Sequence, residues 1–360
     1  MNKLVKVLRA RDLGLQFPGQ PGEYNAITDV TGVTVGFKTL TDTTKYIRTG
    51  VTAIIPINDT NNPSPVWAGH YSLNGNGEMT GTHWINDAGY FFGPVCITNT
   101  HSVGMVHHGV TKWMIQRYKE YFKNEHAWAM PVVAETYDGV LNDINGQHIN
   151  SDHAVEALNS ASNGVVAEGS TGGGNGMICY DFKGGTGTSS RQIEIKGKTY
   201  TVGTLVQANH GIRPWLNILG KPVGRLIPNE TLLAKETGSI IVIIATDAPL
   251  SPLSLRQVAK RAAIGVGRGG SPGGNSSGDI FLAFSVANKK LMPQKDNIII
   301  ENNFLNSEYI DALYLAAVES VEEAVVNALV AGEDVRTFKP KGKICKAIDI
   351  NKLRDIFFSK

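Results

Sequence analysis

Short apolar runs separated by glycines are the feature of this sequence that most limits its fold. Forty glycines occur among 360 residues, and many of them lie between runs rich in valine and isoleucine. β-Branched runs bounded by turn-forming residues are typical of strands, so the sequence predicts extensive sheet. The run from 193 to 206 alternates around Gly197-Lys198, as a hairpin does. The five clearest runs are 51–57, 94–98, 130–134, 193–202 and 238–245.

Two longer segments have the pattern of helices. The first covers about 251–264, with Pro252 at its start and Gly265 expected to end it, and the second covers about 307–330, before Gly332. Sheet and long helices without a regular strand-helix repeat predict a layered α/β or α+β sandwich rather than a barrel. Since no linker or repeat is visible, residues 1–360 are expected to form a single catalytic domain.

Charge and cysteine content limit the partners and the compartment. The chain has 34 Lys and Arg against 32 Asp and Glu, and the net charge of +2 is spread without runs of one sign. Nothing therefore directs it to nucleic acid or an anionic membrane, and a small substrate fits better. Three widely spaced cysteines argue against a disulfide framework. The charged amino terminus and the lack of an ~18-residue apolar run predict a cytoplasmic protein without a membrane span.

A glycine-rich segment before a strand is the best candidate for chemistry. Residues 265–274 lead into Asn275-Ser-Ser-Gly-Asp279 and then the apolar run 280–285, so a loop is expected to deliver two serines to the start of a strand. A serine hydroxyl becomes a useful nucleophile when the fold holds it against a carbonyl and a base takes its proton. If the preceding peptide is attacked first, the chain cuts itself. The serine then gains an α-amine of pKa ~7.7–8.0, which can act as a general base.

Two other interpretations of this segment deserve comparison with the catalytic one. Composition alone favours a Gly/Ser/Asn turn before a buried strand. The stretch Gly265-Val-Gly267-Arg-Gly-Gly270 also matches the Gly-x-Gly-x-x-Gly pattern of dinucleotide-binding proteins. It follows a helix and does not open one, so we reject the nucleotide interpretation, and no cofactor is expected.

The motif Asn275-Ser-Ser-Gly-Asp279, preceded by Thr246-Asp-Ala-Pro-Leu250 and a basic helix, closely resembles the L-aminopeptidase/D-esterase and β-aminopeptidase family of self-cleaving serine peptidases. The resemblance implies a four-layer αββα sandwich, related to the N-terminal-nucleophile hydrolases but with different connectivity. It also implies self-cleavage between Asn275 and Ser276 into an α chain, 1–275, and a β chain, 276–360, and assembly as a tetramer of αβ units. Shorter matches occur in the family's order at 9–14, 25–30, 98–104, 135–139, 141–143, 184–191, 205–211 and 322–329.

Ser276 is the predicted nucleophile, and the second helix supplies candidates to orient it. Glu322 interrupts an otherwise apolar stripe, and a carboxylate in such a position is usually partnered. Ser320 and Glu322 resemble the family's Ser-x-Glu pair that orients the nucleophile. The alternative is that Glu322 lies beside Glu319 and Glu323 on a solvated face. The apolar residues of the stripe are Leu315, Val318, Val325 and Leu329.

Three further residues are predicted to contact the substrate. Asn209 resembles the family's oxyanion-stabilising asparagine, and Tyr137 corresponds to a second oxyanion donor through its hydroxyl. Glu135 resembles the glutamate that holds the substrate's free ammonium group, since a confined carboxylate binds an ammonium strongly. The alternatives are a turn at Asn209 and a surface ion pair at Glu135.

The leading interpretation is a self-processing serine aminopeptidase that releases amino-terminal residues from small peptides, amides or esters through an acyl-enzyme on Ser276. His101, His107 and His108 fit no common zinc motif, so no catalytic metal is expected. One alternative is an acyl transferase like the ornithine acetyltransferases, whose threonine nucleophile differs from Ser276. The other is a noncatalytic ligand-binding protein on the same fold.

Overall fold

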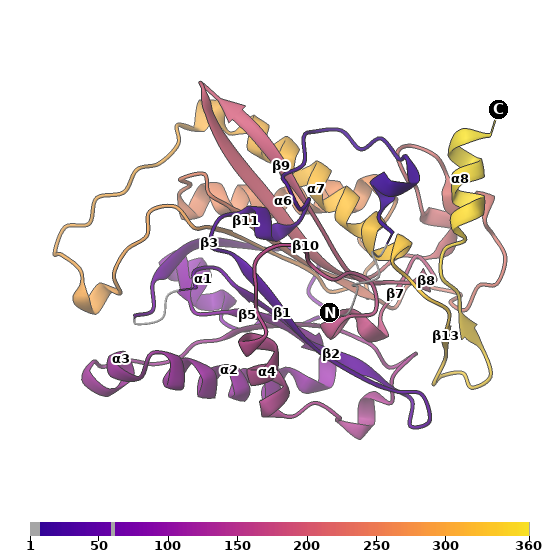
Figure 1. Cartoon of the computed structure of the whole chain (residues 1–360), viewed down its shortest axis with the longest axis horizontal. Coiled ribbons are helices and arrows are strands. Elements are labelled where there is room, and N and C mark those ends of the chain that lie inside the picture. Colours follow the sequence, from indigo (N-terminus) through magenta and orange to yellow (C-terminus); the bar gives the residue numbers. More distant parts are fainter. Residues whose placement is uncertain (1–7, 59–61, 360) are drawn as a thin grey trace, which may run out of the picture.

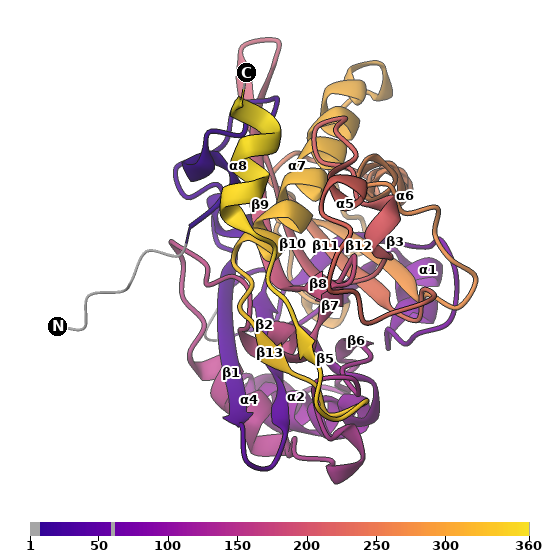
Figure 2. The same ribbon diagram turned by 90° about the vertical axis from the view of Figure 1, so that its right-hand side faces the viewer.

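The protein is built from two β-sheets stacked face to face, with helices on both outer faces (Figures 1 and 2). A computed structural model describes residues 8–58 and 62–359. The described residues do not include 1–7 and 360. The prediction that the chain has no signal peptide depended largely on residues 1–7, and position 360 is the end of the predicted domain. Among the residues that are described, no helix is both long and apolar enough to cross a membrane.

The larger sheet has six strands in the order β4-β3-β12-β11-β10-β9. Its β11 and β12 run parallel, whereas its other neighbouring strands are antiparallel. The predicted hairpin is confirmed, although its turn lies one residue earlier than the predicted Gly197-Lys198. β9 and β10 are joined by Lys196 and Gly197, both at positive φ, which matches the twist of a two-residue hairpin turn. The strands are β3 (Pro65–Ser72), β4 (Tyr90–Phe92), β9 (Gly185–Ile195), β10 (Lys198–Asn209), β11 (Ser239–Thr246) and β12 (Asp279–Ser285).

The smaller sheet has four strands in the order β1-β2-β5-β6, of which β5 and β6 run parallel. Two short ladders, β7 with β8 and β13 with β14, lie outside the main sheets. The strands are β1 (Thr34–Asp42), β2 (Ile47–Ile55), β5 (Val95–Asn99), β6 (Val132–Thr136), β7 (Ile178–Cys179), β8 (Phe182–Lys183), β13 (Val335–Arg336) and β14 (Ile344–Cys345).

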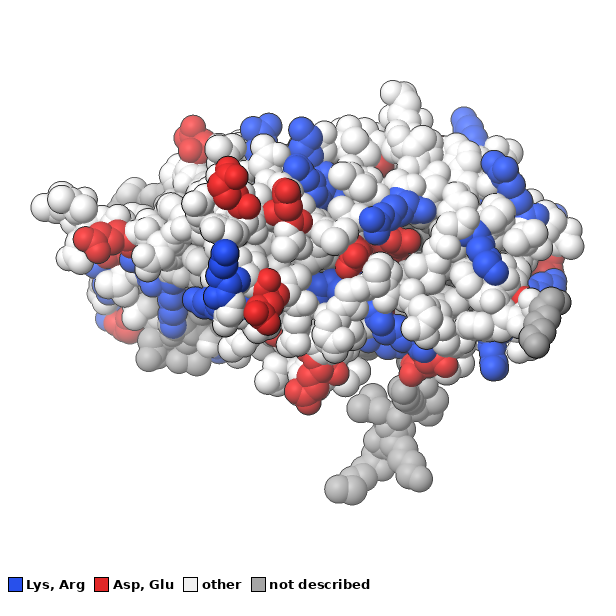
Figure 3. Space-filling model, turned by 90° about the horizontal axis from the view of Figure 1, so that it is seen from above, with Lys and Arg blue, Asp and Glu red and all other residues white. Residues whose placement is uncertain are grey.

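Helices complete the outer layers. Helices α6 (Pro252–Arg268) and α7 (Asp311–Val330) pack on the six-stranded sheet, and α2 (Val103–Arg117) and α4 (Ser151–Asn159) pack on the four-stranded sheet. The predicted αββα sandwich is therefore confirmed. On the face seen in Figure 3, acidic and basic side chains are interspersed. The remaining helices are α1 (Thr82–Ala88), α3 (Lys119–Asn124), α5 (Val223–Leu226) and α8 (Ile350–Phe358).

Strand β11 shows why the apolar runs of the sequence are so long. Alternate residues point to opposite faces of a strand. Ile241 and Ile243 pack into the core between the sheets, while Ile240, Val242 and Ile244 pack beneath α6 and α7. A strand covered on both faces needs an unbroken apolar sequence, which places β11 at the centre of the molecule.

The first predicted helix is longer than expected. It was predicted to end at Gly265, but α6 continues to Arg268. A Cβ on Gly265 would lie 2.7 Å from Cβ of Val321 and 2.8 Å from the carbonyl oxygen of Val318 on α7. Gly265 therefore allows α6 and α7 to approach closely and does not end α6. The position of a glycine in the sequence does not tell these two roles apart. The second helix begins at Asp311, slightly later than predicted.

Candidate active site

Asn209 joins the ends of the two sheets. It is the last residue of β10, and its side-chain amide donates a hydrogen bond to the carbonyl oxygen of Tyr137, just beyond β6 (3.0 Å). Its side-chain oxygen accepts from the backbone N–H of Ile178 (2.8 Å). Asn209, Tyr137 and Gly238 line one small cavity. The structure thus brings together two residues that were predicted to stabilise an oxyanion.

Glu135 is a buried carboxylate at the end of β6. Only 4% of its surface is exposed, and its oxygens accept hydrogen bonds from the backbone N–H of Glu78 (3.0 Å) and from the hydroxyl of Thr100. Burial raises the pKa of Glu135, while these two hydrogen bonds favour its charged form. Since its hydrogen-bond donors are a hydroxyl and a backbone amide, the predicted alternative of a surface ion pair does not describe it.

Ser239 lies directly opposite Asn209. It is the first residue of β11, and the antiparallel register pairs it with Asn209. The side chain is buried, and its hydroxyl oxygen accepts a hydrogen bond from the backbone N–H of Gly278 (3.0 Å). The residues just before it, 228–238, are mostly exposed, so the chain passes from solvent into the core at this serine. Ser239 was not predicted as a site residue, because in the sequence it is one small residue near the start of the apolar run 238–245.

A hydroxyl and a carboxylate are hydrogen-bonded beside Ser239. Ser277 is fully buried and donates from its hydroxyl to a side-chain oxygen of Asp279 (2.5 Å). Asp279 pairs in register with Ile240, the residue after Ser239, and its carboxylate also accepts from the amide of Asn74 (3.3 Å). Burial raises the pKa of Asp279, whereas the hydrogen bonds from Ser277 and Asn74 favour its charged form. Such a pair can orient a nucleophile and relay its proton.

A glycine contact connects Glu135 with this group. A Cβ on Gly77 would lie 3.3 Å from a carboxylate oxygen of Glu135 and 3.3 Å from Cα of Gly278, whose N–H holds Ser239. The carboxylate of Glu135 therefore lies close to the loop that positions the Ser239 hydroxyl. The ends of β6, β10, β11 and β12 meet here in one polar site.

Ser276, the predicted nucleophile, occupies an exposed turn. The backbone N–H of Ser277 bonds to the carbonyl oxygen of Gly274 (2.9 Å), so Asn275 and Ser276 are the two central residues of a β-turn. Both are exposed, and the carbonyl oxygen of Ser276 accepts from the side chain of Asn76 (2.6 Å). The turn interpretation that composition favoured describes this segment well.

Ser320 and Glu322 lie in the helix layer, which corrects the prediction that they orient the nucleophile. The hydroxyl of Ser320 is hydrogen-bonded to that of Thr204 (2.7 Å). Thr204 precedes Asn209 by five residues on β10, which is about 17 Å along a strand. Glu322 forms an ion pair with Arg268 at the end of α6 (3.2 Å). Both residues fasten α7 to its neighbours.

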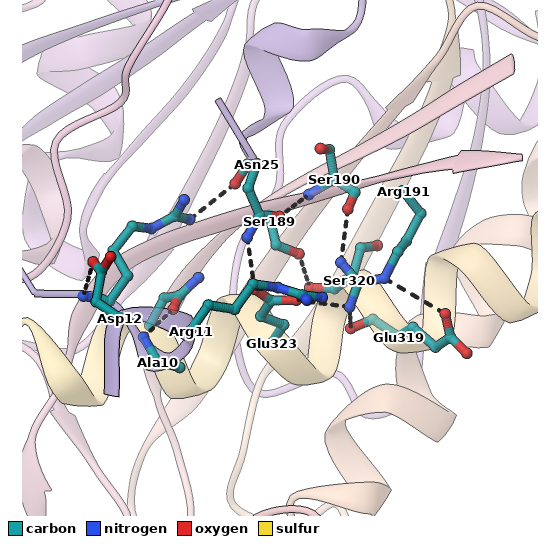
Figure 4. A network of polar contacts seen from close by, with 12 residues as sticks. Ala10, Arg11, Asp12, Asn25, Ser189, Ser190, Arg191, Glu319, Ser320 and Glu323 are labelled. Carbon is teal, nitrogen blue, oxygen red and sulfur yellow. Dashed lines mark hydrogen bonds and ion pairs between the residues drawn. The ribbon is translucent and has the colours of Figure 1, made fainter. Parts of the chain in front are cut away.

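The fully buried carboxylate of α7 is Glu323, which sequence analysis placed on a possible solvated face. Figure 4 shows it between Arg11 and Arg191, whose guanidinium groups lie 2.8 Å and 2.7 Å from its oxygens. Asn25 also donates to it (2.6 Å). Burial opposes ionisation, but the hydrogen bond from Arg11 and the charge of Arg191 outweigh it and lower the pKa of Glu323. No signal in the helical pattern separates Glu323 from Glu322.

The described residues contain no group of three or more His, Cys, Asp or Glu that could hold a metal ion. Two of the histidines considered for a metal, His107 and His108, face different surroundings on α2: His107 is partly buried and His108 is exposed. Burial is the main cause that lowers the pKa of His107.

The sequence matches peptidase family S58 over residues 25–342. This chain belongs to peptidase family S58. The match confirms the resemblance inferred from the sequence motifs, and it spans both the residues before β11 and those after it. The ends of β6, β10, β11 and β12 described above therefore all lie within the part of the chain that the family covers.

Relatives within the S58 family are similar over most of their length. The beta-peptidyl aminopeptidase BapA of Sphingosinicella microcystinivorans is 48% identical over 347 residues, covering 90% of this chain and 86% of the relative. That of Sphingosinicella xenopeptidilytica is 44% identical over 345 residues, covering 90% and 85%.

Solved structures extend the similarity to the fold. The L-aminopeptidase D-Ala-esterase/amidase from Ochrobactrum anthropi, described as a variant of the Ntn hydrolase fold, superposes with a TM-score of 0.93 at 52% identity over 97% of both chains. A Burkholderia sp. beta-aminopeptidase gives 0.89 at 45% identity over 97% of this chain and 98% of its own. The predicted relationship to N-terminal-nucleophile hydrolases is confirmed.

Proposed function

We propose that this S58 chain is a self-processing serine aminopeptidase, and that its nucleophile is Ser239. It releases amino-terminal residues from short peptides, amides or esters through an acyl-enzyme on that serine. The observation that carries the proposal is the position of Ser239, buried opposite Asn209 and next to the hydrogen-bonded Ser277–Asp279 pair. Its relatives' names as aminopeptidases support the same reaction.

The proposed self-cleavage falls before Ser239 and replaces the cut between Asn275 and Ser276 that the motif suggested. A Cβ on Gly238 would lie only 1.7 Å from the carbonyl oxygen of Asn209, so the backbone of Gly238 is pressed against β10. The peptide between Gly238 and Ser239 thus lies beside the Asn209 residue that can stabilise charge on its carbonyl. The products are an α fragment, 1–238, and a β fragment, 239–360.

In the first reaction, the Ser239 hydroxyl attacks the Gly238 carbonyl. The C–N bond breaks as an ester forms, the nitrogen takes up the proton, and water then hydrolyses the ester. Ser239 is left with a free α-amine, whose usual pKa of ~7.7–8.0 suits a general base near neutral pH. Cleavage therefore produces both the nucleophile and the group that activates it.

Each turnover repeats this chemistry on a substrate carbonyl. Ser239 forms an ester with the acyl group, the leaving amine takes a proton, and water releases the product. The side-chain amide of Asn209 has two N–H donors, and one is bonded to Tyr137, so the second can donate to the oxyanion together with the Tyr137 hydroxyl. Ser277 and Asp279 orient the Ser239 hydroxyl.

Glu135 provides the reason for an aminopeptidase rather than an endopeptidase. A buried carboxylate near the nucleophile forms a charge-assisted hydrogen bond with a substrate's free ammonium group. An acylated substrate would leave Glu135 desolvated and without that partner, so it should bind and react poorly.

Assembly into homotetramers, which the family resemblance implies, is part of the proposal. The segment between β12 and α7 extends away from the body of the molecule (Figure 1), and Ile298, Ile299 and Ile300 on it are exposed. Contiguous exposed apolar residues mark interaction sites. We also place the enzyme in the cytoplasm, where its three free cysteines would stay reduced. Light scattering of wild type and Ile299→Asp tests assembly: the variant should dissociate, and a monomeric wild type would contradict the proposal.

The amino-terminal sequence of the smaller fragment tests the nucleophile. Purified protein should separate into two fragments on a denaturing gel, with the smaller one beginning Ser239-Ile240. Ser239→Ala should remain intact and lose at least 10³-fold in hydrolysis of aminoacyl p-nitroanilides, the scale for loss of a nucleophile. Ser276→Ala is the matched control and should be cut and active. A smaller fragment that begins at Ser276 would restore the original motif-based prediction.

A further inference from the structure

The end of the segment that leads into Ser239 is held by an inward-facing carboxylate, while its earlier part is held by Asp181, which accepts hydrogen bonds from the backbone N–H groups of Leu232 and Leu233. Residues 228–238 are mostly exposed, but a carboxylate oxygen of Glu236 accepts a hydrogen bond from the backbone N–H of Gly211 (2.7 Å). Gly211 lies two residues beyond Asn209, the partner of Ser239 in the β10–β11 ladder. Glu236 is thus fixed next to the extension of β10.

The other carboxylate oxygen of Glu236 faces the turn before β12. A Cβ on Gly274 would lie 2.0 Å from it, so the Glu236 carboxylate lies directly against the backbone of this turn. Burial raises the pKa of Glu236, the backbone N–H groups of Gly211 and Gly274 favour its charged form, and Asp279 on β12 disfavours that form. Glu236 therefore lies between the two loops that flank Ser239.

We infer that Glu236 is a positioning residue for self-cleavage, an inference that rests on the proposed function. Its bond to Gly211 holds residues 236–238 along residues 209–211, with the Gly238 backbone pressed against the Asn209 carbonyl. This fixes the last residues of the loop, beyond those that Asp181 holds, so that the Gly238 carbonyl stays beside the Ser239 hydroxyl. The proximity of reacting groups is a large part of the rate of such an intramolecular step.

The role of Glu236 ends with the cut. In the uncut chain only residues 237 and 238 separate Glu236 from Ser239. After the proposed cut, Glu236 is the third residue from the end of the α fragment and is no longer covalently connected to Ser239. A substrate must then occupy the place beside Asn209 that Gly238 held. Glu236 should consequently affect the rate of processing and leave the turnover of the processed enzyme unchanged.

Three variants separate this role from general destabilisation. Glu236→Ala removes the acceptor for Gly211, while Glu236→Gln keeps an oxygen in its place. Glu230→Gln is the control, because Glu230 lies on the same loop but is exposed, 3.7 Å from Lys346. The full-length chains are made by cell-free synthesis and quenched in detergent at timed intervals. Gel densitometry gives the rate of processing, and p-nitroanilide hydrolysis gives turnover for each processed molecule.

We expect Glu236→Ala to process at least tenfold more slowly than wild type, the scale of one charge-assisted hydrogen bond. Glu236→Gln should process at least fivefold faster than Glu236→Ala, and Glu230→Gln should match wild type. Turnover for each processed molecule should stay within twofold for all three.

If Glu236→Ala processed itself at the wild-type rate, the inference would be overturned. An equal loss in the rate of processing and in turnover would also overturn it, because it would place Glu236 in the mature site. Melting temperatures of both variants are measured in a Ser239→Ala background. If Glu236→Gln processed no faster than Glu236→Ala and both melting temperatures fell by a comparable amount, the role of Glu236 would be structural. The amino terminus of the smaller fragment is determined in every sample. A terminus other than Ser239 would refute the proposed function itself, whatever the rates.

Discussion

The same short pattern, a serine followed two residues later by a carboxylate, occurs at the start of β12 and in the middle of α7, with opposite results. At β12 the chain is extended, so Ser277 and Asp279 lie on one side of it and their side chains are hydrogen-bonded (2.5 Å). On α7 residues two apart point to different sides of the helix. Ser320 therefore faces Thr204 on β10, while Glu322 faces Arg268 on α6. Only the extended copy brings its hydroxyl and carboxylate together.

The largest expected effect distinguishes the two neighbouring carboxylates of α7. Glu323→Ala would leave the guanidinium of Arg191, whose side chain is 1% exposed, without its closest carboxylate, and should lower the free energy of unfolding by about 3–5 kcal/mol. Glu322→Gln, whose partner Arg268 is 40% exposed, should cost about 1 kcal/mol or less. Urea denaturation in the uncut Ser239→Ala background measures both.

The contribution of Glu323 should also depend on pH. Its pKa is lowered in the folded protein, so its contribution to stability is present above the unfolded pKa of ~4.3 and is lost as pH falls towards the folded value. The stability difference between wild type and Glu323→Ala should therefore shrink on acidification. A difference of under 1 kcal/mol at neutral pH would show that the Arg–Glu network is not what holds α7.

The second prediction tests the two Ser-x-carboxylate pairs directly. Asp279→Asn should lower kcat by at least ~10², the scale of a lost acid-base or orienting group, whereas Glu322→Gln should stay within a few fold of wild type. Each rate is measured on aminoacyl p-nitroanilides and corrected for the processed fraction. The reverse ranking would return the orienting role to α7.

A smaller effect is expected at Glu135, which lies on the other sheet. Wild type should prefer a free aminoacyl amide over its N-acetyl form by at least ~2 kcal/mol in kcat/KM, and Glu135→Gln should lose most of that preference. Thermal unfolding of the variant provides the control for folding. Equal hydrolysis of both substrates by wild type would remove the aminopeptidase assignment while leaving Ser239 as the nucleophile.

The smallest effect concerns the contact between α6 and α7. Gly265→Ala should destabilise the fold by about 1 kcal/mol or more, because the added methyl group meets Val321. Gly267, two residues further along α6, has no atom within 4 Å of a built Cβ, so Gly267→Ala should be neutral or stabilising by up to about 1 kcal/mol. The melting temperatures of the two variants measure this difference. Equal shifts in melting temperature would argue against close packing at Gly265.

Sequence patterns predicted the layers of this protein better than its site. The apolar run at β11 and the hairpin at Lys196-Gly197 are local features, and local periodicity and turn chemistry were enough to find them. Glu135, Asn209 and Tyr137 were also singled out, because each lies at or just beyond the end of an apolar run and matches a family motif, and their roles stay predictions. The proposed nucleophile depends on which strand ends meet, and Ser239 stands out only when the β10–β11 register places it opposite Asn209.

The order of strands determines what the proposed self-cleavage would do to the folded molecule. Strands β11 and β12 follow the proposed cut, yet they lie in the middle of the six-stranded sheet, with β10 on one side and β3 on the other, both from before the cut. Strands of the two fragments therefore belong to one sheet, and the β11–β12 pair of the smaller fragment is hydrogen-bonded to the larger fragment on both sides. Separating them would require breaking two complete ladders of backbone hydrogen bonds and exposing the cores on both faces. The proposed cut would thus free an amine at the start of β11 while the fold would hold together as though the chain were still continuous.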